Sequence, residues 1–194
     1  MNRLIQLCFL ISLSLGCSGL QVDRLSLTDP RLPVDARRWV ADAEDAVVIS
    51  RAKRDEAVED YAQAQAGLNS VLATGAYKGT DGAAAKMKQE TLALARVEAA
   101  LQARNLANAE LNLSRARLRL IYAETAMRQD ISVYDMPPLQ AAVDQALSVV
   151  VKLRDSHRKA RQSELKATDE WWAAWQKLAA GKGDTRPFWT GGRN

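Results

Sequence analysis

The chain has 194 residues, of which 47% are hydrophobic and only 6% aromatic, and its formal net charge is +4. A composition rich in alanine and poor in large aromatic residues favours long, closely packed helices over a globular core with a deep pocket. The near-neutral charge, with no basic stripe of interleaved aromatic residues, argues against nucleic-acid binding.

The N-terminal sequence MNRLIQLCFLISLSLGC has the order of a secretory signal. Arg3 gives a positive start, an apolar run extends from Leu4 to Leu15, and Gly16 supplies a small residue at the cleavage point. The apolar run is too short to cross a bilayer as a helix. We therefore expect residues 1–16 to be a signal peptide.

The cysteine after this cleavage point makes the region resemble a bacterial lipoprotein signal. That resemblance implies that Cys17 becomes the first residue of the mature protein and carries fatty acyl groups such as palmitate. One position departs from the family's pattern, because Ser14 stands where Leu is usual. Ser18 would favour the outer membrane, since retention in the inner membrane usually involves Asp there. The expected location is the cell envelope, with the protein anchored by lipid in the outer membrane and facing the periplasm.

The only other cysteine, Cys8, lies inside the signal. The mature chain is therefore expected to form no internal disulfide and no thiolate metal site. Residues 17–33, broken by Pro30 and Pro33, are predicted to be an extended tether behind the lipidated cysteine. A first helix is predicted over 34–73, where no proline interrupts the chain.

Three glycines in the segment 74–82 predict a turn after this helix. A second helix is predicted over 81–130. The third is predicted over 136–180, because Asp135 is a candidate N-cap just before a proline. Residues 181–194 are expected to be an irregular tail.

Apolar residues recur in alternating three- and four-residue steps on all three predicted helices, which is the heptad pattern of coiled coils. In the third helix the stripe comprises Leu139, Val143, Ala146, Val150, Leu153, His157, Ala160, Glu164, Ala167, Trp171, Ala174 and Leu178. Short turns between long helices make neighbouring helices antiparallel. The sequence thus predicts an all-α fold, an elongated antiparallel three-helix coiled-coil bundle over 34–180. An alternative is a two-helix hairpin whose third helix is reserved for a partner.

Three polar residues interrupt the apolar stripes, namely Arg54, Gln102 and Glu164. If the two turns are centred near residues 77 and 134, these residues fall at nearly one height. A buried charge needs a partner, so they are expected to form a buried polar layer that fixes helix register. The alternative is that they are boundary residues whose long side chains reach water.

The single histidine, His157, also lies on the stripe of the third helix. One histidine without a cysteine or a second histidine cannot form a usual zinc site, so no metal is expected. His157 is expected to be packed in the bundle or paired with a carboxylate such as Glu44.

Aromatic residues are concentrated near the C-terminus, and the predicted topology brings that end beside the turn at 74–82. The candidate partner-binding residues at this membrane-distal tip are Tyr77, Lys78, Trp172, Trp175, Arg186, Phe188 and Trp189. Aromatic and arginine side chains are the usual anchors of a compact interface. The alternative is that the tail folds back and caps the bundle, and Trp171 is expected in the core.

Since the sequence has no recognisable catalytic motif, we expect neither an enzyme nor a cofactor. The leading hypothesis is a lipid-anchored structural or interaction protein of the cell envelope that presents a membrane-distal binding tip. Its expected partners are the membrane, through the lipid, and another envelope protein or peptidoglycan, with a homo-oligomer as a further option and no nucleic acid.

Two alternatives remain open. The segments AALQA at 99–103 and AELNL at 109–113 resemble the periplasmic helices of outer-membrane efflux factors and their adaptors. That resemblance implies an accessory component that docks to an efflux or secretion machine. The second alternative, a secreted helical toxin or inhibitor, requires that Cys17 carry no lipid.

Overall fold

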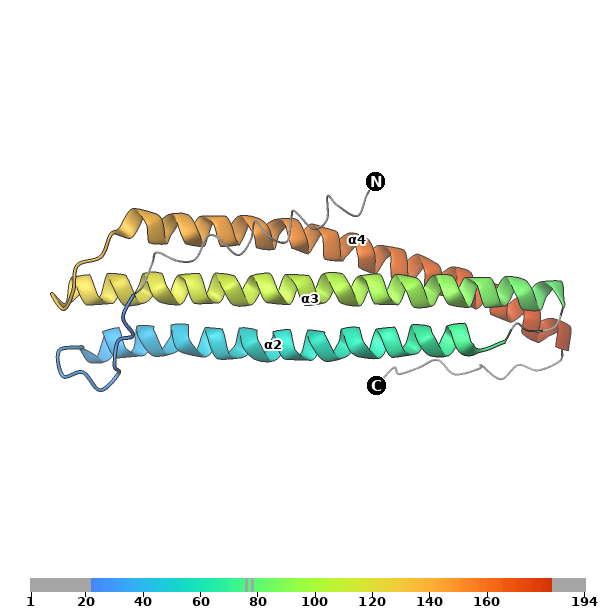
Figure 1. Cartoon of the computed structure of the whole chain (residues 1–194), viewed down its shortest axis with the longest axis horizontal. Helices are drawn as coiled ribbons and strands as arrows, with labels where there is room; N and C mark the ends of the chain where they lie inside the picture. The colour runs from blue at the N-terminus through green and yellow to red at the C-terminus, as the bar shows by residue number, and fades with distance from the viewer. Residues whose placement is uncertain (1–21, 76, 78, 183–194) are drawn as a thin grey trace. The chain divides into compact units, whose positions relative to one another are not determined.

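The structure is a computed structural model that describes residues 22–75, 77 and 79–182. These residues form three helices, α2 (Val34–Ala73), α3 (Thr80–Arg128) and α4 (Met136–Lys182), and no strand occurs among them. Two short connections join the helices (Figure 1). The predicted all-α class and three-helix bundle are confirmed, and each helix begins and ends within two residues of its predicted bounds.

Local chemistry explains where the helices begin and end. Proline precedes α2, and the Pro33 carbonyl accepts the Arg37 amide at 3.0 Å, which starts the helical ladder. After α3, Asp130 adopts the left-handed conformation, with φ of 52°, and the Ile131 amide reaches back to the Ala126 carbonyl at 2.8 Å. This is the Schellman ending of a helix, with aspartate in the position usually taken by glycine.

The connection between α2 and α3 depends on glycine. Gly79 has a φ of 83°, which a side chain would disfavour. At Gly82, an added Cβ would lie 2.6 Å from the carbonyl oxygen of Tyr77. The turn therefore closes tightly because Gly82 has no side chain.

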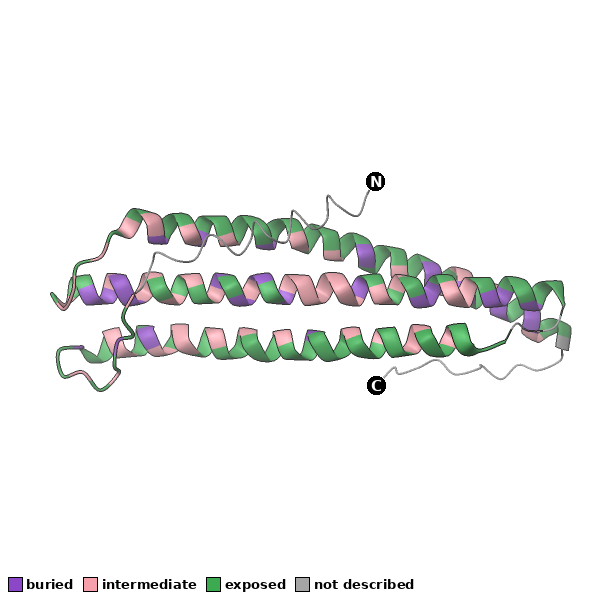
Figure 2. Ribbon diagram, in the orientation of Figure 1, coloured by how far each residue is buried: buried purple, intermediate pink, exposed green. Residues whose placement is uncertain are grey.

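The chain divides into two compact units. Unit 1 comprises residues 1–50 and 110–148, and unit 2 comprises residues 51–109 and 149–194. All three helices contribute residues to both units. Buried residues are concentrated on α3 and α4, whereas α2 is largely exposed (Figure 2). In α2, only Val40 and Ala57 are buried.

The core of unit 1 combines helical residues with two leucines that precede α2. Its buried members are Leu25, Leu32, Val40, Tyr122 and Ala126. Helices α2 and α3 run antiparallel here, because Ser50 contacts Ser114 while the earlier residue Glu44 contacts the later residue Tyr122.

The core of unit 2 is built between α3 and α4 and is rich in tryptophan. Its buried members are Ala85, Leu92, Ala167, Trp171, Trp175 and Leu178. Lys88 bonds to Glu170 at 2.7 Å and Arg96 lies 3.8 Å from Glu164, so these two helices are also antiparallel.

One buried cation ties α2 to α3 in unit 2. The ammonium of Lys86 donates to the Val71 carbonyl in the last turn of α2 and lies 3.6 Å from Glu90. A cation near the last carbonyls of a helix interacts favourably with the helix dipole. Lys86 therefore caps α2 and fixes its end against α3.

Candidate functional site

The predicted signal peptide and the lipidation site Cys17 lie outside the described residues. The first described residue is Val22, and the structure of residues 22–33 corrects the predicted extended tether. Leu25 and Leu32 are buried in the core of unit 1, and Val22 and Leu27 pack against the same cluster. Burial of these apolar side chains offsets the entropy lost when a short segment becomes ordered. This part of the chain is a docked segment of the fold.

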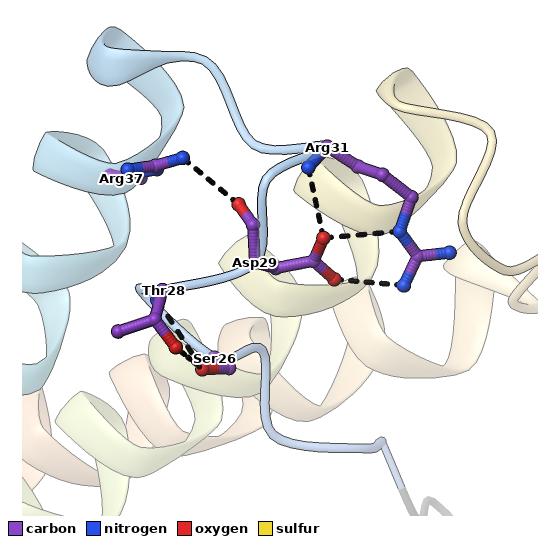
Figure 3. A network of polar contacts seen from close by, with 5 residues as sticks. All are labelled: Ser26, Thr28, Asp29, Arg31 and Arg37. Carbon is purple, nitrogen blue, oxygen red and sulfur yellow. Dashed lines mark hydrogen bonds and ion pairs between the residues drawn. The ribbon is translucent and has the colours of Figure 1, made fainter.

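A compact turn around Asp29 shapes this docked segment (Figure 3). The Asp29 carboxylate accepts the backbone amide of Arg31 at 2.9 Å and a bidentate pair of bonds from the Arg31 guanidinium. These bonds lower the pKa of Asp29 to about 2. The guanidinium of Arg37, from the first turn of α2, donates to the carbonyls of Asp29 and Leu32. The turn is thus bonded to the start of α2.

A second set of polar contacts fastens the docked segment to α2 and α3. Arg24 donates to the Glu44 carboxylate at 3.1 Å, and the Tyr122 hydroxyl donates to the same carboxylate oxygen. Burial, followed by the bond to Glu44, raises the pKa of Tyr122 to about 12. The Asp23 amide donates to the Tyr134 hydroxyl at 3.3 Å, in the connection between α3 and α4. The segment therefore contacts both helices and the connection that follows them.

A groove of about 480 Å³ opens between α2 and α3 in unit 1. The guanidinium carbon of Arg128 lies 5.1 Å from the centre of the Trp39 ring, which is cation–π geometry. The Thr125 hydroxyl is buried without a hydrogen-bond partner. The groove is lined by Pro33, Asp35, Ala36, Trp39, Thr125, Arg128 and Gln129.

The predicted aromatic binding tip is corrected in part. Trp175 is only 8% exposed and stacks on Trp171, with ring centres 6.5 Å apart. Tyr77 packs edge-on against Trp175 at 6.1 Å, so both belong to the core of unit 2. The reason is that Gly82 lets the turn fold Tyr77 down onto α4.

Of the predicted tip residues, Trp172 remains a surface residue, with 41% of its area exposed. Its ring centre lies 6.0 Å from that of Trp171. The other predicted partner-binding residues, Lys78, Arg186, Phe188 and Trp189, lie outside the described residues.

The predicted buried polar layer is wrong in its pairing. Arg54, Gln102 and Glu164 are only partly buried. Arg54 pairs with Asp55 at 3.1 Å, and Gln102 donates to Glu98 at 2.8 Å. Glu164 instead accepts from Arg161 and lies 3.8 Å from Arg96.

The physical reason is helix register. Arg104 lies over the ring of Tyr61 at 4.4 Å, and this contact fixes the heights of α2 and α3 in unit 2. Arg54 precedes Tyr61 by seven residues, so in antiparallel helices it lies level with the position seven residues after Arg104. That position is roughly nine residues, or about 13 Å, beyond Gln102 along α3. The three residues therefore lie at different heights, as the boundary-residue alternative allows.

His157 is partly buried and lines a groove of about 430 Å³ in unit 2. Alanine and polar side chains from all three helices line this groove. They are Asp60, Gln63, Ala64, Arg96, Ala99, Ala100, Ala103, His157, Arg161 and Glu164. The suggested partner of the histidine, Glu44, is bonded to Arg24 and Tyr122 instead.

Within residues 22–75, 77 and 79–182, no group of three or more metal-binding side chains is present. In the same part of the chain, no helix is both long and apolar enough to cross a membrane. No family model, curated protein or solved structure matches the chain.

Sequence reasoning missed the residues that dock the N-terminal segment, chiefly Arg24, Leu25 and Leu32. A signal was present, because four large apolar residues fall between positions 22 and 32 of a segment predicted to be an extended tether. Linkers that stay in water are usually poor in large apolar residues. Their density could have indicated a segment that packs.

Proposed function

We propose that this protein is a lipid-anchored interaction protein of the cell envelope, attached through Cys17. The lipoprotein-like signal is the starting point, and the docked segment is the observation that carries the proposal. A chain that enters the folded core so soon after an acylated cysteine holds the body of the protein close to the membrane. Several acyl chains on one residue would make the attachment stable, because each buried methylene adds to membrane affinity.

The test compares two cysteine substitutions in the full-length chain. Cys17→Ala should release the protein from the membrane fraction and remove the acylated N-terminal peptide from its mass spectrum. Cys8→Ala is the matched control, because Cys8 lies in the predicted signal, and it should leave both readouts unchanged. An unacylated parent protein would contradict the proposal and favour a secreted helical protein, such as a toxin or inhibitor.

We place the recognition surface on one face of α4 in unit 2. Val151, Leu165 and Trp172 are all exposed and are separated by multiples of seven residues. Such spacing places them on one side of the helix. Large apolar residues repeated along an exposed helix face suit an amphipathic helix of another envelope protein. Of the predicted tip residues, this surface keeps Trp172 and leaves out Tyr77 and Trp175, which pack in the core of unit 2.

Site-specific photo-crosslinking in intact cells tests this surface. A crosslinker at Leu165 or Trp172 should capture a defined partner, whereas one at Ser163, exposed on another side of α4, should not. An efflux or secretion component among the adducts would favour the accessory alternative, and a second copy of the chain would indicate a homo-oligomer. Equal capture at all three positions would contradict the assignment.

A further inference from the structure

Few residues separate the proposed anchor from the end of unit 1 that contains the α3–α4 connection. Val22 packs against the core cluster of unit 1, as do Ile131 and Tyr134 of the connection between α3 and α4. The neighbouring Asp23 amide donates to the Tyr134 hydroxyl at 3.3 Å. Val22 follows Cys17 by five residues, and five extended residues span at most about 18 Å. If Cys17 is acylated, as the proposed function on which this inference rests requires, the α3–α4 connection is held near the bilayer surface.

This same end exposes apolar side chains that the core does not use. In the α3–α4 connection, Ile131 and Tyr134 turn inward to the core, while Val133 is 91% exposed. Val34, the first residue of α2, is 78% exposed. Val34 begins α2 and Val133 follows the end of α3. In unit 1 the start of α2 and the end of α3 lie at the same end (Figure 1).

An amphipathic pair lies next to these residues. Trp39 is 38% exposed, and Arg128 lies over its ring at 5.1 Å. Tryptophan and arginine are side chains that settle at the level of lipid head groups, with the ring against apolar groups and the cation in the polar layer. Trp39 is five residues into α2 from Val34, or about 7.5 Å along the helix. That separation matches the depth at which interfacial protein segments are buried.

The charges at this end do not select a lipid of one sign. Basic and acidic residues are mixed, and two of the arginines are already paired with carboxylates. The charged residues at this end are Asp23, Arg24, Asp29, Arg31, Asp35, Arg37, Arg38, Arg128, Asp130 and Asp135. A zwitterionic bilayer is therefore a sufficient partner.

We propose that this end of unit 1 is a second, non-covalent membrane contact. Val34 and Val133 enter the boundary between head groups and acyl chains, and Trp39 with Arg128 lies at the head-group level. The contact fixes the orientation of unit 1 on the bilayer, which insertion of the acyl chains alone would not do. In the anchored protein, the exposed side chains of Val34 and Val133 would then be covered by lipid.

The experiment uses the acylated full-length protein on phosphatidylcholine vesicles. Single substitutions Val34→Cys, Val133→Cys and Val48→Cys are labelled with the environment-sensitive fluorophore nitrobenzoxadiazole. Val48 is the matched control, because it is an exposed valine of the same helix and unit, about 21 Å from Val34 along α2. Acylation of each sample is read by mass spectrometry, and circular dichroism reports its fold.

The labels at positions 34 and 133 should shift to shorter emission wavelength on vesicles and be quenched by brominated acyl chains, while the label at position 48 should not. Emission from positions 34 and 133 that stays like that from position 48, on protein shown to be acylated and vesicle-bound, would overturn the membrane contact and leave the anchor standing. Protein that carries no acyl group would overturn the proposed function, and this inference with it.

Discussion

The two units share the same three helices but complete their cores by different means. Unit 2 uses aromatic residues from the helical repeat, with Trp171 and Trp175 of α4 packed against α3. Unit 1 uses a non-helical segment, whose Leu25 and Leu32 pack beside Val40. The helices supply every buried member of the unit 2 cluster, with Tyr77 packed against it from the connection, whereas the unit 1 cluster buries two leucines from outside the helices. In unit 1, those residues lie next to the proposed lipid anchor, so anchoring and folding share one segment.

The largest expected effect is in the core of unit 2. Trp175→Ala removes a buried aromatic side chain and should lower the free energy of unfolding by about 3–5 kcal/mol. Trp172→Ala is the control, because that side chain is exposed and its loss should cost less than about 1 kcal/mol. Denaturant unfolding followed by circular dichroism measures both. Similar losses for the two variants would mean that the two tryptophans do not differ in burial.

The next effect tests the docked segment of unit 1. Leu32→Ala should cost about 2–5 kcal/mol, because Leu32 is among the most buried side chains of the described residues. Leu72→Ala, at an exposed position of α2, should change stability by less than about 0.5 kcal/mol. Equal effects from the two changes would show that residues 22–33 do not belong to the core.

A smaller effect is expected at the hydroxyl of Tyr122. Tyr122→Phe removes a bond to a charged acceptor and should cost about 1.5–3 kcal/mol. Tyr61→Phe removes only a contact with the exposed Gln65 and should cost less than about 0.5 kcal/mol.

The bond between Tyr122 and Glu44 should also make the stability of unit 1 depend on pH. The pKa of Tyr122 is raised to about 12 from its ordinary 10.0, so the neutral phenol is the form favoured by folding. The stabilisation that the neutral Tyr122 phenol gives the folded state is therefore present below pH 10 and is lost as the pH rises through 12. Absorbance titration of tyrosinate should show one late-titrating residue, which Tyr122→Phe removes. A wild-type titration without that late step would contradict the contact.

Glycine substitutions should have opposite signs at two positions of unit 2. Gly82→Ala places a Cβ against the Tyr77 backbone and should destabilise by about 1–3 kcal/mol. Gly67→Ala, inside α2 with open space around it, should stabilise by about 0.5–1 kcal/mol. A stabilising Gly82→Ala would mean that the turn is not closed on Tyr77.

The smallest effect is expected at the exposed turn of unit 1. The pKa of Asp29 is lowered from 3.8 to about 2. The stabilisation that the ionised carboxylate gives the folded state is therefore present above pH 3.8 and is lost as the pH falls through 2. Asp29→Asn should remove this acid-dependent loss while leaving stability at neutral pH only slightly reduced, since its ion-pair partner Arg31 is largely exposed and solvent screens the pair. Thermal unfolding of both proteins between pH 2 and 6 measures the difference; identical acid profiles would rule out the turn as its source.

The sequence predicts the helices because their limits depend on local signals, such as Pro33, the glycines at 74–82 and Pro137. It predicts Trp171 in the core for the same reason, because heptad spacing is local. The partners of Arg54, Gln102 and Glu164 could not be predicted, since matching heights across two turns requires the geometry of each turn. The packing of Tyr77 on Trp175 and of Leu25 and Leu32 in unit 1 is also non-local, and no periodic pattern encodes it.

Hydrogen exchange with mass spectrometry on the membrane-extracted, full-length protein measures both the acylation of Cys17 and the docking of residues 22–33. We expect an acylated peptide beginning at Cys17, together with slow exchange at the amides of Asp29, Arg31 and Leu32, which are hydrogen-bonded within the docked segment. Leu32→Ala should accelerate that exchange in unit 1 more than in unit 2. An unacylated N-terminus would rule out the lipid anchor, and exchange of residues 22–33 at the rate of an unstructured chain would rule out the docked segment.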